Sequence, residues 1–339
     1  MKFTRTLLVA EIGINHNGDM ALAEKMVRAA KEAGADAVKF QNYHTDEFLT
    51  DHTLTYTYRC QGREVTESQY AMFKRCELSV SDLARLRHCC DDHEIDFFST
   101  PMGVEGVDEL LSVGTSYLKN GSDCLGHLPL IRYMARSGVA TILSTGMANE
   151  REIAEAVEAF RGAGGRELIL LACTSAYPTP AEDAHLLRIP ELARRFGCAA
   201  GFSDHTAGWE AAVASVCLGA CMIEKHFTSD RGLPGPDQWF SSDPAEFAEL
   251  VRRVRRTEVM LGRAELRPAD AELRSREEFR LSCIAARDLP VGHVVTERDI
   301  AFHRPASGLP PSQAEAIKGR TLARALARGT MFSWQDLAA

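Results

Sequence analysis

The amino-acid sequence predicts an α/β protein: a (β/α)8 barrel followed by a small C-terminal domain of short strands and turns. Two observations predict the barrel. Short, continuously apolar runs alternate with stretches of helical period eight times within about 260 residues. Each apolar run also ends in polar or charged residues, and barrels carry their sites at this carboxyl-terminal rim of the strands.

The first four strand–helix units follow from their hydrophobic pattern. Asp19 is a candidate N-cap of the first helix and Gly34 a candidate for its end, because an oxygen-bearing side chain caps the first amides and glycine accepts the geometry that follows the last turn. A long polar and aromatic insertion, residues 43–75, separates the second strand from its helix. We predict strands over residues 7–12, 37–41, 96–100 and 117–119, and helices over 19–33, 79–93, 104–113 and 129–137.

The last four units repeat the pattern, with strands that are apolar throughout because helices cover a parallel sheet. A doubly wound open sheet is the main alternative, but residues 13–18 lack the G-x-G-x-x-G spacing that it needs after the first strand. We predict strands over 141–144, 168–173, 199–203 and 222–226, and helices over 149–163, 184–196, 209–218 and 244–261. The predicted domains are a barrel over residues 1–262, a charged helical linker over 263–278 and a C-terminal domain over 279–339.

The composition is that of a soluble globular protein. Of the 339 residues, 45% are hydrophobic and 25% are charged. A net charge of −8 and a pI near 5.8 argue against nucleic acid or an acidic membrane as the main partner. The N-terminal apolar stretch is too short for a signal peptide, and no segment is long and apolar enough to span a bilayer. We therefore expect a cytoplasmic protein.

The ten cysteines show no repeated C-x-x-C pair, and several lie in apolar contexts. A thiol packs there as a small hydrophobic group, and cytoplasmic thiols stay reduced. The sequence therefore assigns no cysteine to a metal or a disulfide.

Two histidines, His205 and His226, close consecutive predicted strands twenty-one residues apart, with a helix between them. This β-α-β arrangement places both strand ends on one rim of the sheet. With Asp204, Glu224 and Lys225 beside them, the two imidazoles predict a metal-assisted active site. The alternative is that both histidines cap strand ends through backbone hydrogen bonds.

The other strand ends add two lysines, an amide and several hydroxyl groups. That set suits a small ligand carrying phosphate and carboxylate, because lysines supply charge and hydroxyls supply donors. Some of these residues are expected to be solvated loop residues instead. The set comprises Glu11 and Asn15, Lys39 and Gln41, Ser99 and Thr100, Lys119 and Ser122, Ser144 and Thr145, Thr174 and Ser175, and Ser203.

Eight motifs, in order and spacing, resemble the sialic acid synthase family, which includes legionaminic and pseudaminic acid synthases. The resemblance covers essentially the whole chain, and residues 291–300 and 303–308 look like that family's C-terminal antifreeze-like (SAF, β-clip type) domain. The motifs are AEIGINHNG (10–18), VKFQ (38–41), FSTP (98–101), STGM (144–147), CTSAYPTP (173–180), GFSDHT (201–206), IEKHFT (223–228) and GPD (235–237).

The resemblance implies a condensation of phosphoenolpyruvate with the open-chain aldehyde of an N-acetylated hexosamine, giving a 2-keto-3-deoxy nonulosonic acid and phosphate. It implies that His205 and His226 hold a divalent ion, expected to be Mn²⁺ with Mg²⁺ or Co²⁺ as alternatives, that polarises the aldehyde. The residues implied to bind phosphoenolpyruvate are Lys39, Thr100, Lys119, Ser122, Ser144, Ser175 and Ser203.

The same resemblance assigns catalytic roles to two carboxylates. Glu11 is expected to direct or deprotonate the water that adds to C2, and Glu224 to stabilise the cationic intermediate or the metal shell. The family forms a domain-swapped homodimer in which an arginine of the antifreeze-like domain reaches the partner's sugar, and Arg304 fits that position. Its alternative is a solvated surface arginine. The residues implied to contact the sugar are Gln41, Tyr177, Asp237 and Arg304.

The sequence departs from the family pattern at a few positions, and the last two of them lie near the expected sugar end. Cys124 stands where the family commonly has an acidic residue, Ser175 where sialic acid synthases often carry asparagine, and Gln238 and Trp239 follow the GPD motif in place of the usual histidine and its neighbour. We therefore expect the donor to be phosphoenolpyruvate but leave the acceptor open: N-acetylmannosamine, a 2,4-diacetamido-dideoxyhexose or a less usual aldose.

Two other classes of function remain as alternatives. A metal-dependent aldolase or lyase would use free pyruvate, and it would not need two lysines and a hydroxyl cluster for phosphate. A non-catalytic sugar- or ice-binding protein would not need the two histidines and two glutamates together.

Overall fold

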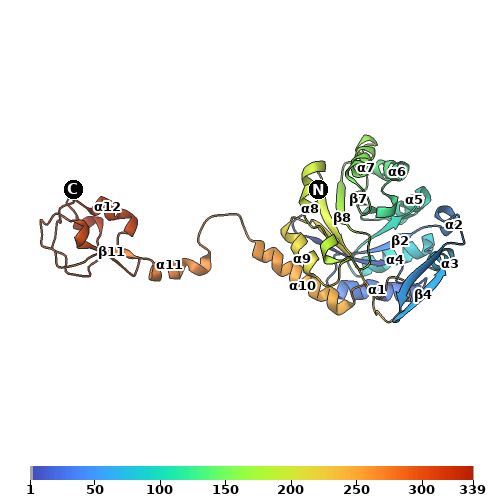
Figure 1. The fold of residues 1–339 in the computed structure, drawn as a ribbon, viewed down its shortest axis with the longest axis horizontal. Helices are drawn as coiled ribbons and strands as arrows, with labels where there is room; N and C mark the ends of the chain where they lie inside the picture. The colour runs from blue at the N-terminus through green and yellow to red at the C-terminus, as the bar shows by residue number, and fades with distance from the viewer. Residues whose placement is uncertain (1–2, 339) are drawn as a thin grey trace. The chain divides into compact units, whose positions relative to one another are not determined.

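The computed structural model describes residues 3–338, which form two compact units that divide between Gly262 and Arg263. In the first unit, parallel strands close into a barrel in the order β1-β10-β9-β8-β7-β6-β5-β2, with helices around it (Figure 1). The predicted (β/α)8 barrel is confirmed. Its strands are β1 (Leu7–Gly13), β2 (Ala37–Asn42), β5 (Asp96–Pro101), β6 (Leu118–Asn120), β7 (Thr141–Ser144), β8 (Leu168–Cys173), β9 (Ala199–Asp204) and β10 (Met222–His226).

The covering helices begin and end close to the predicted positions. Asp19 caps the first of them by accepting from the amides of Ala21 and Leu22. Gly34, at a φ of +90°, follows that helix. The helices are α1 (Met20–Glu32), α4 (Val80–Asp92), α5 (Val104–Val113), α6 (Leu128–Arg136), α7 (Glu150–Gly162), α8 (Arg188–Phe196), α9 (Glu210–Cys217) and α10 (Pro244–Leu261).

Strand side chains alternate between the barrel interior and the helices, as the two-residue period of a strand requires. One buried cluster packs against the helices and includes Ala10, Val38 and Phe202. A second cluster fills the barrel interior and consists of Val9, Ala37, Phe98, Ile142, Ile169, Leu171 and Met222. This apolar layer closes the barrel from within, so that the residues two positions further along each strand form the floor of its mouth.

The insertion after β2 has regular structure that the sequence analysis did not predict. It contains α2 (Thr45–Phe48), the antiparallel hairpin of β3 (Thr55–Cys60) and β4 (Arg63–Ser68), and α3 (Gln69–Arg75). Gln61 and Gly62 make the turn, both with positive φ, as a two-residue hairpin turn requires. Alternating tyrosines in residues 55–60 and the following glycine were the signal for this hairpin.

The second unit is small and rich in turns. An antiparallel pair, β11 (Ser282–Ala285) and β12 (Ile300–His303), packs with a short helix, α12 (Ala314–Ile317). Its core includes Cys283, Leu322 and Phe332. The segment predicted as a helical linker is helical only in part, since α11 spans Leu273–Phe279 and begins ten residues after the linker does. Within residues 3–338, no helix combines the length and the apolarity needed to cross a bilayer.

Candidate active site

Eight inward side chains form a ring at the mouth of the barrel, which we call the inner ring. Each lies at the end of its strand, two residues beyond an inward position of the layer below it. All eight are buried, although seven of them are charged or bear a hydroxyl group in a place where a barrel could carry apolar groups. The inner ring consists of Glu11, Lys39, Thr100, Lys119, Ser144, Cys173, Ser203 and Glu224.

The charged members of the inner ring interact with one another. Lys39 Nζ lies 2.9 Å from Glu11 Oε2 and 3.9 Å from Glu224 Oε1. Lys119 Nζ donates to Glu224 Oε1 at 3.3 Å. The two buried cations and two buried carboxylates therefore balance in charge. An anion that enters must bind to lysines that already pair with these carboxylates.

The pKa values of the two carboxyl groups, Glu11 and Glu224, are shifted in opposite directions. Burial raises the pKa of Glu11 to about 7, although Lys39 opposes this change. Burial also acts to raise the pKa of Glu224, but Lys119 and Lys39 outweigh it and leave that pKa well below its usual value. Glu11 can therefore accept a proton near neutral pH while Glu224 stays ionised, a separation that lets two nearby carboxyls perform different tasks.

Hydroxyl groups surround an open position beside Gly146. The amide of Gly146 donates to Ser122 Oγ at 3.1 Å. A Cβ placed on Gly146 would lie 2.6 Å from Ser122 Oγ and 2.5 Å from Ser175 Oγ, so both hydroxyls converge on the space that the missing side chain leaves. Ser144 Oγ is buried there without a hydrogen-bond partner. This cradle of donors suits an oxyanion.

The remaining hydroxyls are tied to the charged groups. Lys39 Nζ donates to Thr100 Oγ1 at 2.9 Å, and Ser203 Oγ donates to Glu224 Oε1 at 3.1 Å. These bonds fix the rotamers of both charged side chains. The structure thus brings all seven residues expected to bind phosphoenolpyruvate to one mouth.

His205 and His226 stand above the inner ring, with ring centroids 5.5 Å apart. Nδ1 of His205 donates to the carbonyl oxygen of Thr174 at 2.8 Å, which leaves Nε2 with its lone pair. Nδ1 of His226 is buried without a hydrogen-bond partner and lies 3.8 Å from Asp237 Oδ2. Only His205 thus makes the backbone contact that strand-end capping predicts.

The two histidines fit a divalent cation. Burial and the neighbouring His205 hold the pKa of His226 well below its usual range, so its imidazole is neutral, as a metal ligand must be. Asp237 beside His226 resembles the carboxylates that orient ligand histidines. Among the described residues, no group of three or more His, Cys, Asp or Glu side chains could hold a metal ion. The chain would therefore supply two imidazoles and leave other coordination positions to water or substrate.

The residues expected to contact the sugar lie partly at this mouth. Gln41 Nε2 donates to Glu11 Oε1 at 3.3 Å. The ring of Tyr177 lies 4.2 Å from that of His205 and 5.6 Å from that of His226. Arg304 belongs to the second unit, where its guanidinium lies 5.1 Å from the ring of Phe279. Tyr177 and Asp237 therefore border the histidines, whereas Gln41 borders Glu11 of the inner ring.

Several polar residues named from the sequence point away from the barrel mouth. Asp204 and Lys225 flank the histidines in sequence, but the strand period turns both toward the outside, where they form an ion pair of 2.8 Å. The hydroxyl of Thr174 donates to the carbonyl oxygen of Asp183. Asn15 bonds the carbonyl oxygen of Phe227 and so supports the loop after β10.

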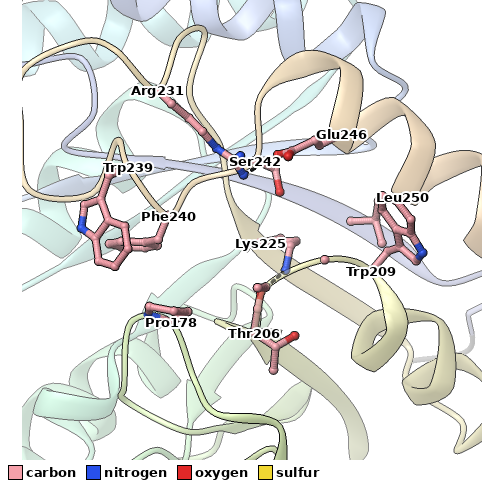
Figure 2. Close-up of a pocket in the computed structure, with 12 residues that line it drawn as sticks. Pro178, Thr206, Trp209, Lys225, Arg231, Trp239, Phe240, Ser242, Glu246 and Leu250 are labelled. Carbon is pink, nitrogen blue, oxygen red and sulfur yellow. Dashed lines mark hydrogen bonds and ion pairs between the residues drawn. The ribbon is translucent and has the colours of Figure 1, made fainter. Parts of the chain in front are cut away.

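Figure 2 shows the pocket of about 270 Å³ on that outer side, between the loops that follow β9 and β10. Lys225 reaches the carbonyl oxygen of Thr206 as well as Asp204. Arg231 pairs with Glu246 across the same pocket. The charged groups of this pocket are thus paired with one another, and its polar side chains stabilise the loops that carry the site.

Sequence reasoning missed two members of the site. Cys173 belongs to the inner ring, with Sγ 3.6 Å from Ser122 Oγ and 3.8 Å from His205 Nδ1. Its place two residues after the inward Leu171 was the available signal. Phe240 packs against His226 with ring centroids 5.0 Å apart, and no pattern in the sequence predicts that contact.

Gln238, one of the departures from the family pattern, is a structural residue. It is 1% exposed, its amide nitrogen donates to the carbonyl oxygen of Asn15 at 2.7 Å, and its amide oxygen accepts from Thr228 Oγ1. Trp239 is half-buried and faces the hairpin, where Arg59 lies over its ring. Of these two departures, Trp239 is the one placed to meet a ligand.

Comparisons with known proteins agree with this arrangement. The NeuB family model matches residues 26–266, and the SAF domain model matches residues 282–338. The N,N'-diacetyllegionaminic acid synthase of Legionella pneumophila is 38% identical over 336 residues, covering 98% of this chain and 94% of that protein. The pseudaminic acid synthase of Helicobacter pylori is 33% identical over 331 residues, covering 97% of each.

A solved structure supports the same relationship. The N-acetylneuraminic acid synthetase of Leptospira borgpetersenii, crystallised with citrate, superposes with a TM-score of 0.71 at 34% identity, covering 80% of this chain and 90% of that one. The predicted resemblance to sialic acid synthases, with a SAF domain, is therefore confirmed.

Proposed function

Since this chain belongs to the NeuB family, we propose that it condenses phosphoenolpyruvate with the open-chain aldehyde of an N-acylated hexose. The products are a nine-carbon 2-keto-3-deoxy acid and inorganic phosphate. Relatives with this architecture are named as synthases of legionaminic, pseudaminic and N-acetylneuraminic acids. The observation that carries the proposal is the inner ring, where two buried lysines and a hydroxyl cradle face a pair of histidines.

The donor end has the groups that phosphoenolpyruvate needs. Its phosphate and carboxylate together carry more negative charge than Lys39 and Lys119 can neutralise, and the uncharged donors at Thr100, Ser144 and the Gly146 cradle supply the rest. The lysines are already oriented by Glu11 and Glu224, so little reorganisation accompanies binding. An aldolase that uses free pyruvate would have one anionic group to bind and would leave part of this set without a partner.

The reaction needs a carbon–carbon bond and then the addition of water. C3 of phosphoenolpyruvate attacks the aldehyde carbon with the electrons of the C2–C3 double bond, which leaves positive charge at C2. The aldehyde oxygen takes the carbonyl electron pair and a proton and becomes a hydroxyl group. The ionised carboxylate of Glu224 stabilises that charge, and Glu11, with a pKa of about 7, takes the proton of the water that adds to C2. Phosphate then leaves from C2 as the ketone forms.

A divalent ion, which we propose to be Mn²⁺, would be held by Nε2 of His205 and by His226, and would polarise the aldehyde oxygen as a Lewis acid. The adjacent imidazoles of His205 and His226 and the carboxylate of Asp237 beside His226 support this assignment. Tyr177 beside the histidines and Gln41 beside Glu11 would orient the sugar.

The quaternary arrangement is part of the proposal. We place the enzyme in the cytoplasm as a domain-swapped homodimer in which Arg304 of one subunit contacts the sugar bound by the other. The resemblance to the family supports this assignment. So does the side chain itself, since among residues 3–338 no carboxylate lies within 4.0 Å of the Arg304 guanidinium.

The experiment measures phosphate release from phosphoenolpyruvate with Mn²⁺ across a panel of aldoses, with mass spectrometry of the products. The panel holds N-acetylmannosamine, 2,4-diacetamido-trideoxyhexoses and simple hexoses and pentoses. The proposal predicts release with an N-acylated hexose and a product of aldose plus pyruvic acid. Product formation from free pyruvate, without phosphate release, would replace it with the aldolase.

A further inference from the structure

A second cavity, of about 490 Å³, adjoins the sugar side of the barrel mouth. It lies between the β3–β4 hairpin and the loop after β10. Nothing in the chemistry above uses it. We call it the hairpin groove, and its principal lining residues are Tyr56, Tyr58, Arg59 and Arg63 of the hairpin and Trp239 and Phe240 of the loop.

A continuous row of rings leads from the histidines into the hairpin groove. Tyr177 lies 4.2 Å from His205, Phe240 lies 5.2 Å from Tyr177, and Trp239 lies 5.7 Å from Phe240, all between ring centroids. Tyr177 also lines the groove. This row of rings therefore connects the two histidines with the hairpin groove.

The groove combines aromatic faces with free hydrogen-bond donors. The Arg59 guanidinium lies 5.9 Å from the centre of the Trp239 ring, and Tyr56 stacks on Tyr58 at 5.7 Å. Among residues 3–338, no carboxylate lies within 4.0 Å of the Arg59 or Arg63 guanidinium. A guanidinium that lies over an indole ring at this distance keeps its N–H groups available to a carbonyl oxygen.

The two walls of the groove are held together before any ligand arrives. Gln61, at the tip of the hairpin, donates from Nε2 to the carbonyl oxygen of Gly232 at 2.8 Å. The hydroxyl of Tyr58 donates to Glu67, which also pairs with Arg75. A preformed groove binds at a smaller entropic cost than a loop that must first become ordered.

We propose that the hairpin groove binds the end of the acceptor remote from its aldehyde and selects an aldose with a second acylamino group there. The inference rests on the proposed function. A planar amide fits between the Trp239 and tyrosine faces, its carbonyl oxygen accepts from Arg59, and its methyl group is removed from water. A hydroxyl group in the same place would leave the aromatic faces and most of the volume unused.

Steady-state kinetics of the full-length enzyme test this proposal, comparing a 2,4-diacetamido-2,4,6-trideoxyhexose with N-acetylmannosamine. We expect the wild type to prefer the diacylated sugar. Trp239→Ala and Arg59→Gln are each expected to lower kcat/KM for that sugar on the order of tenfold, with a smaller effect on N-acetylmannosamine. The KM for phosphoenolpyruvate should not change.

Trp209→Ala is the matched control. Trp209 also lies under an arginine, with Arg253 4.2 Å from its ring, and both tryptophans line the pocket of Figure 2, but Trp209 does not line the hairpin groove. This variant should keep the preference for the diacylated sugar. Thermal melting of all three variants establishes that they are folded.

Calorimetry with the alditol of the diacylated sugar, which has no aldehyde and cannot react, keeps this test separate from the proposed function. The wild type should bind it about tenfold more tightly than Trp239→Ala does. The proposal would be overturned if the wild type and Trp239→Ala bound the alditol equally tightly, or if Trp239→Ala lowered kcat/KM equally for both acceptor sugars. A wild-type preference for a hexose 6-phosphate would also overturn it. Absence of phosphate release with every aldose would instead remove the proposed function, and alditol binding would still decide the role of the groove.

Discussion

The inner ring and the hairpin groove adjoin one barrel mouth but are built in different ways. Every member of the inner ring comes from a strand, so the apolar layer below fixes its position. The hairpin groove is formed by an insertion and a loop that are distant in the sequence, and they are joined by the hydrogen bond from Gln61 to Gly232 and by the contact of Arg59 with Trp239. The difference indicates that the barrel strands bind the donor, whereas an insertion and a loop select the acceptor.

The largest effect is expected when one histidine of the pair above the inner ring is replaced. His226→Ala should lower kcat about a thousandfold or more, because the aldehyde loses its electrophilic activation. The side chain lies at a rim and not in the core, so the variant should keep the melting temperature within a few degrees. Metal content by mass spectrometry and phosphate release are the two readouts, and full activity in protein without metal would exclude the assigned role.

Glu11→Gln removes the proton acceptor but keeps the shape of the side chain. Turnover should fall about a hundredfold or more. In the wild type the base must be ionised, so kcat/KM should decrease as the pH falls below about 7, the pKa to which burial raises Glu11. That acidic limb should disappear from the pH profile of the variant. If the limb persists unchanged, another group titrates there.

Lys225→Met tests whether a charged side chain that points out of the barrel contributes to stability but not to donor binding. Lys225 belongs to the strand that carries Glu224 and His226, but it pairs with Asp204 on the outer side. Removing it leaves a buried carboxylate without its cation, so unfolding by denaturant should show a loss of about 3–5 kcal/mol. The KM for phosphoenolpyruvate should stay within about twofold. A large rise in that KM with unchanged stability would place Lys225 in the donor site instead.

The smallest effect is expected at Gln238. Gln238→His restores the residue usual in the family, but this side chain is buried and bonds Asn15 and Thr228 away from the groove. The ratio of kcat/KM between mono- and diacylated acceptors should change less than about twofold. A changed preference would show that the loop acts through Gln238 as well as Trp239.

The sequence was sufficient to predict the strands, most helices and the donor end, because hydrophobic period and strand-end chemistry are local properties. It was not sufficient to predict that the side chains of Asp204 and Lys225 point out of the barrel, since that requires knowing which of their apolar neighbours point into it. The hairpin was missed because its polar residues resemble a loop. The contact of Arg59 with Trp239 could not be predicted, since it depends on how two distant segments fold together.

The most direct test of the division between donor and acceptor ends is calorimetric titration of phosphoenolpyruvate, with Mn²⁺ and without sugar, into four proteins. These are the wild type, Lys39→Met, Lys225→Met and Trp239→Ala. We predict that affinity falls about tenfold or more in Lys39→Met alone, since its ammonium group lies in the inner ring. Unchanged affinity in Lys39→Met, or an equal loss in Trp239→Ala, would contradict the account.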